Sequence, residues 1–412
     1  MRRVVVTGFG VVSPVGCGRE AFWSALAEGR SGIGPITRFD CSAFDVRLAG
    51  EVKEAPDLPE PVAEVAAEDP KVGFAFAAVR EALDAAGLNR LDSRTVLHLG
   101  TSLEIFDLSK VICGGRPDFK AAVGRSLAGG PRLQFPLDTA ARLIAEEYGR
   151  PGESLTNCSA CAASAQAIGH SWRAVRDARW EAALCGGFDS MINPLGVGGF
   201  QMLGALTTDN DRGPQACRPF DAARRGAVLG EGAAVLVLEP LEKARAEGKA
   251  VLAEVCGYGS SLDAFGLSAP DPDGDGAVRA MQGALREAGI SSEAVAHINT
   301  HGTGTHLNDE VEARAIRRVF PTWERIPVAA TKSVTGHLIG AAGAVEAGAC
   351  LMTLNRGLIP PNPSLSKVAP GCELMHVTGR AARFDGEYVL SNSFGFGGQN
   401  AALIFRRYDG RA

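Results

Sequence analysis

Short apolar runs alternate with amphipathic stretches along the whole chain. Residues 71–86 and 277–288 repeat apolar side chains at the spacing of one helix face, which predicts amphipathic helices. The shorter apolar runs between such stretches predict strands. These predicted strands are residues 3–7, 96–100, 182–184, 233–238, 251–255, 296–300, 388–391 and 401–406. Their alternation with helical stretches predicts an α/β fold.

Two further helical stretches, residues 158–169 and 336–350, are rich in alanine, glycine and serine. Small residues on all sides let neighbouring layers approach closely, as a helix buried between two sheets requires. One such stretch in each half of the chain suggests a duplicated α/β unit in a layered sandwich. The charged stretch 239–249 predicts a solvated helix that joins the halves, and we expect a boundary near Val251, between residues 1–250 and 251–412.

Composition narrows the class of protein. The 412 residues are 46% hydrophobic and 22% charged, with 42 basic against 47 acidic side chains and a net charge of −5. Without a basic tail or a long run of charges of one sign, binding to nucleic acid is not expected. No run of about 18 apolar residues predicts a membrane span. The first 14 residues predict a strand and not a signal peptide, because glycines and a proline interrupt the apolar run.

The ten cysteines show no paired spacing. Reduced thiols therefore fit better than a disulfide framework or a zinc site, and we expect a cytoplasmic protein. Cys161 is the first candidate for chemistry, because it begins a small-residue helix after a segment, 156–159, that could act as a turn and cap. A thiol at a helix N-terminus gains thiolate character. The alternative is a buried structural cysteine, which is what most free cysteines are.

Histidines on glycine-rich loops are the other candidates. His301 directly follows a predicted strand, where a parallel sheet presents its ligand edge, although an ordinary loop histidine has the same pattern. A metal site of His301, His306 and Asp309 matches no standard zinc spacing. Lys332 and His337 precede the second small-residue helix, and a lone lysine there could be a surface charge.

Several familiar motifs are excluded. GFGGQN at 395–400 joins two predicted strands, so it offers no helix terminus to a phosphate, and TGFGVVSP lacks the third glycine of a dinucleotide fingerprint. No G-x-S-x-G elbow and no papain-type motif occurs. One cysteine with two histidines suits acyl-thioester chemistry, in which the thiol carries the acyl group and two imidazoles hydrogen-bond an enolate.

Taken together, several motifs resemble the elongating β-ketoacyl-[acyl-carrier-protein] synthases, which are condensing enzymes of the thiolase superfamily. The resemblance covers nearly the entire chain, with the motifs in the family's order. They are RRVVVTGFGVVSPVG, SACAASAQAIG, PLGVGGF, CRPFDAARRGAVLGEGAAVLVLE, DAFGLSAPDPDGDG, NTHGTGTHLND, TKSVTGHLIGAAGAVE and SNSFGFGGQN.

The resemblance implies a five-layer αβαβα sandwich of two duplicated halves and a decarboxylative Claisen condensation with malonyl-[acyl-carrier-protein]. Cys161 would be the nucleophile, His301 and His337 would stabilise the enolate, and the backbone N–H groups of Cys161 and Phe396 would form the oxyanion hole. Phe396 would also be a gate. Lys332 would pair with Glu312 and hold the histidine loop, with Asp309 in support. Residues expected to contact substrate are Thr303, Thr305, Phe200, Phe394 and Gly397.

The resemblance also bears on cofactors and partners. It implies no organic cofactor, because the phosphopantetheine arrives on the acyl carrier protein. A structural cation occurs in some relatives, and here it would lie near Asn299, Glu346, Ser391 and Asn392. A homodimer is expected, and a heterodimer with a paralogous subunit is the alternative.

Two departures from the family concern carrier-protein docking. The stretch 64–69, usually basic, is acidic here, and Gly204 stands where an arginine often lies. Like charges would weaken docking of an acidic carrier protein, which suggests a specialised pathway unless Arg125, Arg132 or Arg224 serves instead. The segment LEIFDLSKVICGG also departs from the glycine-rich family version.

Other functions remain open at this point. They are a non-elongating chain-length partner, a malonyl decarboxylase and, less favoured, a degradative thiolase. The first two usually lack the nucleophilic cysteine, which is present here. Neither Cys350 nor Cys372 lies in a motif that would supply a thiolase's second catalytic cysteine. Chain length and the choice between fatty-acid and polyketide or polyene synthesis do not follow from the sequence.

Overall fold

The computed structural model describes residues 1–54, 56–103, 108–113, 116–130 and 132–410. Strands from both halves of the chain form one hydrogen-bonded sheet in the order β16-β14-β13-β18-β19-β12-β1-β11-β9-β5-β8. The strands of the first half are β1 (Val4–Ser13), β5 (Thr95–Gly100), β8 (Glu153–Asn157), β9 (Ala182–Asp189) and β11 (Gly232–Pro240). Those of the second half are β12 (Ala253–Leu262), β13 (Val295–Asn299), β14 (Pro327–Ala329), β16 (Met375–His376), β18 (Tyr388–Gly395) and β19 (Gln399–Arg406).

The two halves repeat the same pairing pattern. In the first, β1, β11 and β9 are antiparallel neighbours, and β9, β5 and β8 are parallel neighbours. In the second, β12, β19 and β18 are antiparallel, and β18, β13 and β14 are parallel. The halves meet where β1 and β12 pair over three residues of each strand. The predicted duplication is therefore present as a repeated topology.

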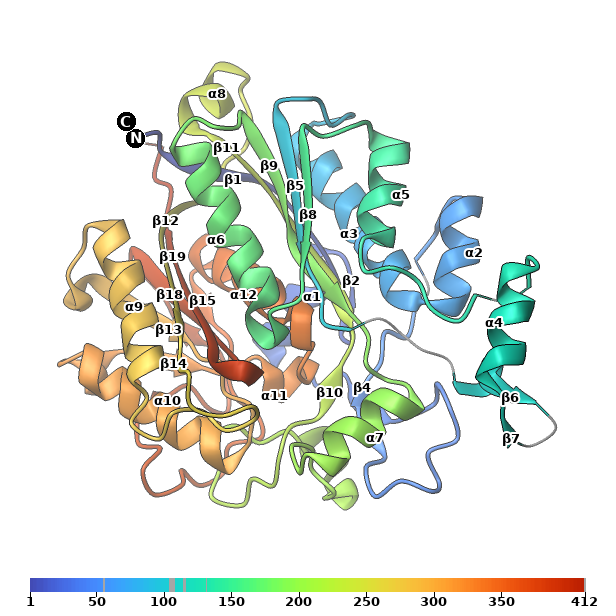
Figure 1. Ribbon diagram of the computed structural model, residues 1–412. Coiled ribbons are helices and arrows are strands. Elements are labelled where there is room, and N and C mark those ends of the chain that lie inside the picture. Colours follow the sequence, from blue (N-terminus) through green and yellow to red (C-terminus); the bar gives the residue numbers. More distant parts are fainter. Residues whose placement is uncertain (55, 104–107, 114–115, 131, 411–412) are drawn as a thin grey trace.

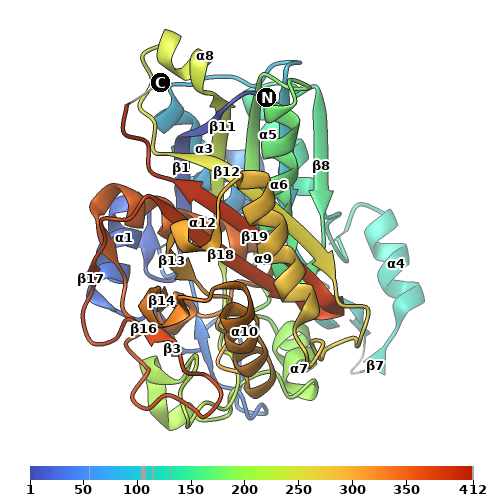
Figure 2. The same cartoon turned by 90° about the vertical axis from the view of Figure 1, so that its left-hand side faces the viewer.

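Helices complete five layers (Figure 1). α3 (Pro70–Ala86) packs on β1, β11 and β9, and α5 (Thr139–Tyr148) packs on α3. On the other half, α9 (Asp275–Ala288) covers β12 and β19, with α10 (His306–Val319) beside it. Between the two sets of strands lie α6 (Ala163–Arg176) and α12 (Ala342–Arg356), each of which contacts strands of both halves. Figure 2 shows the second half from its outer side.

The middle layer, α6 and α12, needs small residues because its helices pack in direct contact with each other and with the strands. A Cβ added to Gly343 in α12 would lie 2.7 Å from the Cβ of Ala165 in α6. A Cβ added to Gly348 would overlap the ring of Phe9 in β1. These contacts confirm the prediction that the alanine- and glycine-rich stretches lie buried between the strands.

The remaining elements are short and surround this frame. The helices are α1 (Arg19–Glu28), α2 (Glu60–Glu68), α4 (Phe119–Leu127), α7 (Pro194–Met202), α8 (Leu241–Ala246) and α11 (Lys332–Thr335). The strands are β2 (Gly16–Cys17), β3 (Ile33–Pro35), β4 (Leu48–Gly50), β6 (Ile112–Cys113), β7 (Arg116–Pro117), β10 (Leu229–Gly230), β15 (Leu358–Ile359) and β17 (Ala382–Arg383). Across the described part of the chain, no helix has the length and apolar character to cross a membrane.

The charged stretch 239–249 differs from its prediction. Only six residues form helix α8, and Glu239 lies fully buried at the end of β11. Its carboxylate pairs with Lys243 and Lys249, each at 2.8 Å. The prediction of a solvated helix is wrong at Glu239. A run of charged residues usually lies on the surface, but here two lysines that are close in the fold compensate the charge of a buried carboxylate.

Candidate active site

Cys161 lies in a 3₁₀ turn, Ala160–Ala162, between β8 and α6. Its side chain is 4% exposed. Ala160 has a φ of +49°, in the left-handed region that side chains usually avoid, and this conformation turns the chain sharply from the strand into the helix. The predicted cap at 156–159 is confirmed only in part: β8 continues to Asn157, and Ser159 takes the N-cap position of the turn without a side-chain cap, since its hydroxyl donates to Gln166 at 2.6 Å.

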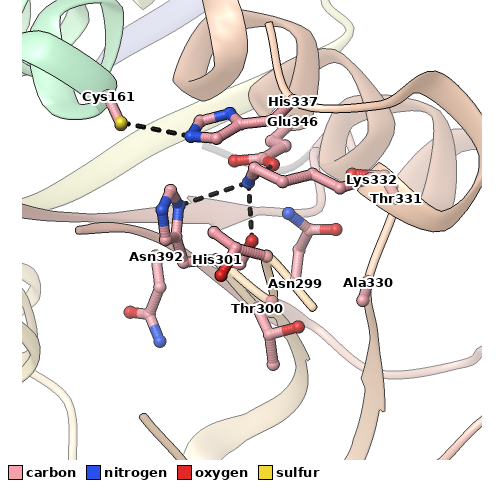
Figure 3. A network of polar contacts seen from close by, with 12 residues as sticks. Cys161, Asn299, Thr300, His301, Ala330, Thr331, Lys332, His337, Glu346 and Asn392 are labelled. Carbon is pink, nitrogen blue, oxygen red and sulfur yellow. Dashed lines mark hydrogen bonds and ion pairs between the residues drawn. The ribbon is translucent and has the colours of Figure 1, made fainter. Parts of the chain in front are cut away.

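His337 reaches Cys161 from the second half of the chain (Figure 3). It follows α11, and its Nε2 lies 3.1 Å from the Cys161 Sγ. Its other ring nitrogen, Nδ1, accepts a hydrogen bond from the Ile339 backbone N–H at 3.3 Å. Since Nδ1 accepts, the proton of the neutral ring belongs on Nε2, which points at the sulfur.

His301 directly follows β13, which pairs in parallel with β14 and β18, and so lies at the strand end that the sequence indicated. Its ring meets that of His337 edge-on, with the centroids 5.2 Å apart. The Lys332 Nζ lies 3.2 Å from His301 Nδ1 and donates to the His301 carbonyl oxygen at 2.6 Å. A lysine ammonium can only donate, so the His301 ring also carries its proton on Nε2.

Lys332 forms its buried ion pair with Glu346 of α12 and not with Glu312, which corrects the predicted pairing. Both side chains are almost fully buried. Glu312 instead accepts hydrogen bonds from the backbone N–H groups of His301, at 2.7 Å, and Gly302, at 2.8 Å. Glu312 therefore holds the histidine loop directly, while Lys332 holds the imidazole.

Asp309 is buried and holds the next residues of the same loop. Its carboxylate accepts hydrogen bonds from the backbone N–H groups of Thr303 at 3.1 Å, Gly304 at 3.2 Å and Phe220 at 2.7 Å. His306, by contrast, is exposed at the start of α10. A metal site of His301, His306 and Asp309 is not supported, because backbone donors occupy the Asp309 carboxylate and these three side chains form no group of possible ligands among the described residues.

Burial dominates the protonation of the site. It raises the pKa of the Cys161 thiol to about 11, opposed by the charge of Lys332 and the Phe396 N–H and reinforced by Asp189 and Glu346. The thiolate character expected from a helix N-terminus is thus outweighed by desolvation. Burial, followed by the charge of Lys332, lowers the pKa of both His301 and His337 well below 6.5, so both rings are neutral at pH 7.

Cys161, His301 and His337 place three possible metal ligands within 4.8 Å of one another. Metal binding at a histidine needs the lone pair of the liganding nitrogen. Here each Nδ1 faces a donor, so each Nε2 carries a proton and has no lone pair to offer. The arrangement suits two hydrogen-bond donors beside a thiol better than a metal centre.

A cavity of about 350 Å³ opens over the three side chains. It is lined by Thr303, Thr305, Phe200 and Phe394, all expected to contact substrate, but Gly397 is exposed and does not line it. The Phe396 ring stacks on Phe200 with centroids 6.0 Å apart. The hydroxyls of Thr303 and Thr305 are 2.9 Å apart.

Two groups of this site were missed from the sequence. The Ile339 N–H, which sets the protonation of His337, belongs to the backbone and leaves no signal in residue type. Glu346 was considered only for a cation, although it is the one charged residue within the small-residue stretch 336–350, a position that usually requires a buried partner.

The candidate cation site has a mixed set of atoms. Asn299 Nδ2 lies 3.5 Å from the Ser391 Oγ, and Asn392 Nδ2 donates to Glu312 at 3.1 Å. Glu346 Oε2 and Asn392 Oδ1 are buried oxygens without a hydrogen-bond partner. Carbonyl and carboxylate oxygens are the donors that hard cations prefer, so these residues fit such an ion.

Comparison with known proteins gives the family. Residues 1–244 match the β-ketoacyl synthase N-terminal domain, and residues 252–366 match the β-ketoacyl synthase C-terminal domain. The chain belongs to the β-ketoacyl synthase family. It is 37% identical to the 3-oxoacyl-[acyl-carrier-protein] synthase 2 of Coxiella burnetii, over 98% of this chain and 99% of that one. The enzyme of the same name from a Synechocystis species is 38% identical, over 99% and 98%.

A solved structure, that of the ishigamide ketosynthase/chain length factor, superposes on this chain with a TM-score of 0.85. The two sequences are 37% identical, and the match covers 99% of each chain. The likeness confirms the predicted thiolase-like fold.

Proposed function

We propose that the chain catalyses the decarboxylative condensation of an acyl thioester with malonyl-[acyl-carrier-protein], giving a β-ketoacyl product for fatty-acid or polyketide synthesis. The observation that carries the proposal is a buried thiol beside two neutral imidazoles whose Nε2–H groups face the same cavity. The relatives named 3-oxoacyl-[acyl-carrier-protein] synthase support the reaction and its carrier protein.

Acyl transfer is the first step. The Cys161 sulfur attacks the carbonyl carbon of the acyl thioester, and the carrier's thiolate leaves and takes up the proton that Cys161 gives up. The N–H groups of Cys161 and Phe396 are suited to receive the oxyanion, because the Phe396 N–H already hydrogen-bonds the sulfur and Gly395 lies against the Cys161 nitrogen. The thiol, protonated at rest, loses its proton only as it reacts.

Condensation follows on the acylated enzyme. The C–C bond to the malonyl carboxylate breaks and carbon dioxide leaves. The electron pair of that bond forms an enolate, whose oxygen accepts hydrogen bonds from the Nε2–H groups of His301 and His337. The enolate carbon then attacks the acyl carbon on Cys161, the C–S bond breaks, and the Cys161 thiolate that leaves takes up a proton from water. Lys332 keeps His301 oriented, and its charge disfavours an imidazolium.

The phosphopantetheine arm is supplied by the carrier protein, so the chain needs to supply only a channel for it. Thr303 and Thr305, at the cavity wall, are suited to hydrogen-bond its amides. Phe396 lines the cavity, stacked on Phe200, and is suited to a gate. A bound cation at Glu346 and Asn392 would supply structural charge compensation and no chemistry of its own.

Mass spectrometry of the intact protein tests this proposal. Wild type and Cys161→Ala are incubated with carrier proteins bearing a ladder of acyl chains, and malonyl carrier protein follows. An adduct that needs Cys161 and then disappears into β-ketoacyl product supports elongation. If the cognate carrier protein and any partner subunit are supplied and no adduct forms, elongation is wrong, and a chain-length or decarboxylase subunit becomes the better assignment.

A dimer with a second copy of this chain is also proposed. β8 is an edge strand, and no described strand pairs with its side away from β5. Leu155 in β8 is 45% exposed, and Phe119, Val123 and Leu127 form an exposed apolar stripe on α4. Figure 2 places β8 and α4 on the same side of the molecule. An edge strand flanked by apolar side chains is suited to antiparallel pairing about a two-fold axis.

Light scattering of the purified chain tests the dimer, with Leu155→Lys expected to give monomers. If the chain alone is a monomer and dimerises only with a co-expressed paralogue, the heterodimer replaces the homodimer. The ishigamide ketosynthase, described together with a chain length factor, is the precedent for that outcome. We also infer a cytoplasmic location, supported by nine cysteines of the described chain that form no disulfide.

Of the three arginines proposed for carrier-protein docking, Arg224 is not available to a partner. Arg224 is buried and binds Glu310 at 2.8 Å, so it is unavailable to a partner, whereas Arg125 and Arg132 are exposed. Asp69 is buried too, so the acidic surface of α2 is narrower than the sequence suggested. Gly204 lines the cavity, and no described residue of α2 does. Tight, salt-dependent binding to a generic fatty-acid carrier protein would overturn the specialised pathway.

A further inference from the structure

Asp189 is a buried carboxylate that the reaction above does not use. It ends β9, and its side chain is fully buried. One oxygen, Oδ1, accepts the Ser102 hydroxyl and the Ser190 N–H, each at 2.9 Å. The other, Oδ2, accepts the Gly340 N–H at 2.7 Å. Asp189 thus connects strand ends of the first half to a turn of the second half.

That turn lies directly behind His337. It is the 3₁₀ turn Ile339–Ala341, and Ile339 has a φ of +43°, which is strained for a β-branched residue. A Cβ added at Gly340 would lie 2.7 Å from the Thr101 Cα and 2.8 Å from Asp189 Oδ2, so the turn packs tightly against both residues. The Ile339 N–H that fixes the His337 proton therefore depends on a strained turn held by Asp189.

The charge of a buried lysine, Lys71, acts on Asp189 through space. Lys71 of α3 is 2% exposed, and its ammonium donates to the Leu103 carbonyl oxygen and lies 4.0 Å from Asp69. Burial raises the pKa of Asp189, and the charge of Lys71 is the strongest influence that lowers it. Asp69 shares this lysine, and burial raises its pKa to about 6. A buried carboxylate without this cation would take up a proton.

We propose that Asp189 is a positioning residue: its carboxylate, supported by Lys71, holds the Ile339–Ala341 turn so that the Ile339 N–H stays directed at His337 Nδ1. The inference rests on the proposed condensation for its catalytic consequence. Its structural part, the restraint of the turn by the Asp189 carboxylate, stands on the hydrogen bonds from Ser102, Ser190 and Gly340.

The test compares wild type with Asp189→Asn, Lys71→Met and the double variant. Glu239→Gln is the matched control, because Glu239 is also a fully buried, lysine-paired carboxylate, with the Thr7 hydroxyl at 2.7 Å. It lies near the C-terminal end of the neighbouring strand β11, whereas Asp189 pairs with Gly232 at the N-terminal end of that strand. Two quantities are measured: hydrogen–deuterium exchange of the peptide around Gly340, and kcat and KM for decarboxylation of malonyl carrier protein.

Both single variants are expected to speed exchange around Gly340 by about tenfold and to lower kcat by about tenfold, with KM within about threefold. The double variant is expected to be no worse than Asp189→Asn, because Lys71 is expected to act on the turn only through the charge of the Asp189 carboxylate. Glu239→Gln should leave both readouts near wild type.

Unchanged exchange around Gly340 in the variants would overturn the inference, and so would faster exchange with kcat equal to that of Glu239→Gln. If Asp189→Asn does not fold, Lys71→Met decides by the same criteria. Should wild type itself fail to decarboxylate malonyl carrier protein, the proposed function fails, and the exchange measurement still decides whether Asp189 holds the turn.

Discussion

The Nε2 of His337 lies 3.1 Å from the Sγ of Cys161, although 176 residues separate them in the chain. The two side chains come from equivalent turns of the two halves: Cys161 lies within one 3₁₀ turn, and His337 lies two residues before the other. Each turn enters a buried helix and contains a residue with an unusual positive φ, Ala160 in one and Ile339 in the other. Duplication of one α/β unit has therefore brought a nucleophile from one copy against a hydrogen-bond donor from the other.

The two histidines are expected to serve the condensation half-reaction more than acyl transfer. His337→Ala and His301→Ala should each lower decarboxylation of malonyl carrier protein by about 10²- to 10³-fold, because one donor to the enolate oxygen is lost. Acylation of Cys161 should persist, within about tenfold of wild type. Release of carbon dioxide and the mass of the acyl-enzyme measure the two steps separately. Equal losses in both steps would argue against separate roles.

The buried Lys332–Glu346 pair should be costly to break from one side. Lys332→Met leaves Glu346 without its cation, and breaking such a pair typically destabilises a protein by about 3–5 kcal/mol. Burial already raises the pKa of Glu346 to about 7, so part of this loss can be relieved by protonation. Chemical denaturation measures the effect. In the double variant Lys332→Met/Glu346→Gln, much of the stability should return; no recovery would mean that the two side chains do not act as a pair.

The reactivity of Cys161 should increase with pH well beyond the usual thiol range. Its pKa, raised by burial to about 11, means that the thiolate fraction grows about tenfold per unit between pH 7 and pH 10. Inactivation by iodoacetamide should follow this slope without a plateau near pH 8.5. Lys332→Met should slow the reaction further, since the lysine charge favours the thiolate. A plateau below pH 8 would show that the thiol is activated at rest.

The middle layer should tolerate no added volume at Gly348. Gly348→Ala would place a Cβ against the Phe9 ring, which is itself fully buried in the core. Overpacking of this kind costs about 1–3 kcal/mol. Gly124→Ala on α4, where an added Cβ meets nothing within 4 Å, is the control and should be neutral or slightly stabilising. Thermal unfolding of the two variants makes the comparison, and equal melting temperatures would contradict this account of the layer.

The fold class, the two buried helices and four residues of the site could be predicted from the sequence alone. The alternation of strands and helices indicated an α/β class, and the two small-residue stretches marked the helices that lie between the strands. Motif order singled out Cys161, His301, His337 and Lys332, and the structure brings all four together. These features are local: periodicity, residue size and short spacings record them directly in the chain.

Other features were decided only by the tertiary structure. Glu312 and Glu346 both lie on helices that reach the site, and their spacing in the sequence does not indicate which carboxylate pairs with Lys332. Glu346 forms the ion pair because α12 packs against the strands beside the lysine. The protonation of both imidazoles depends on the donors that face each Nδ1, one of them a backbone N–H. The pKa of Cys161 likewise depends on how completely the fold removes water. Charge pairing, ring protonation and desolvation are properties of three-dimensional neighbours, and a linear sequence does not carry them.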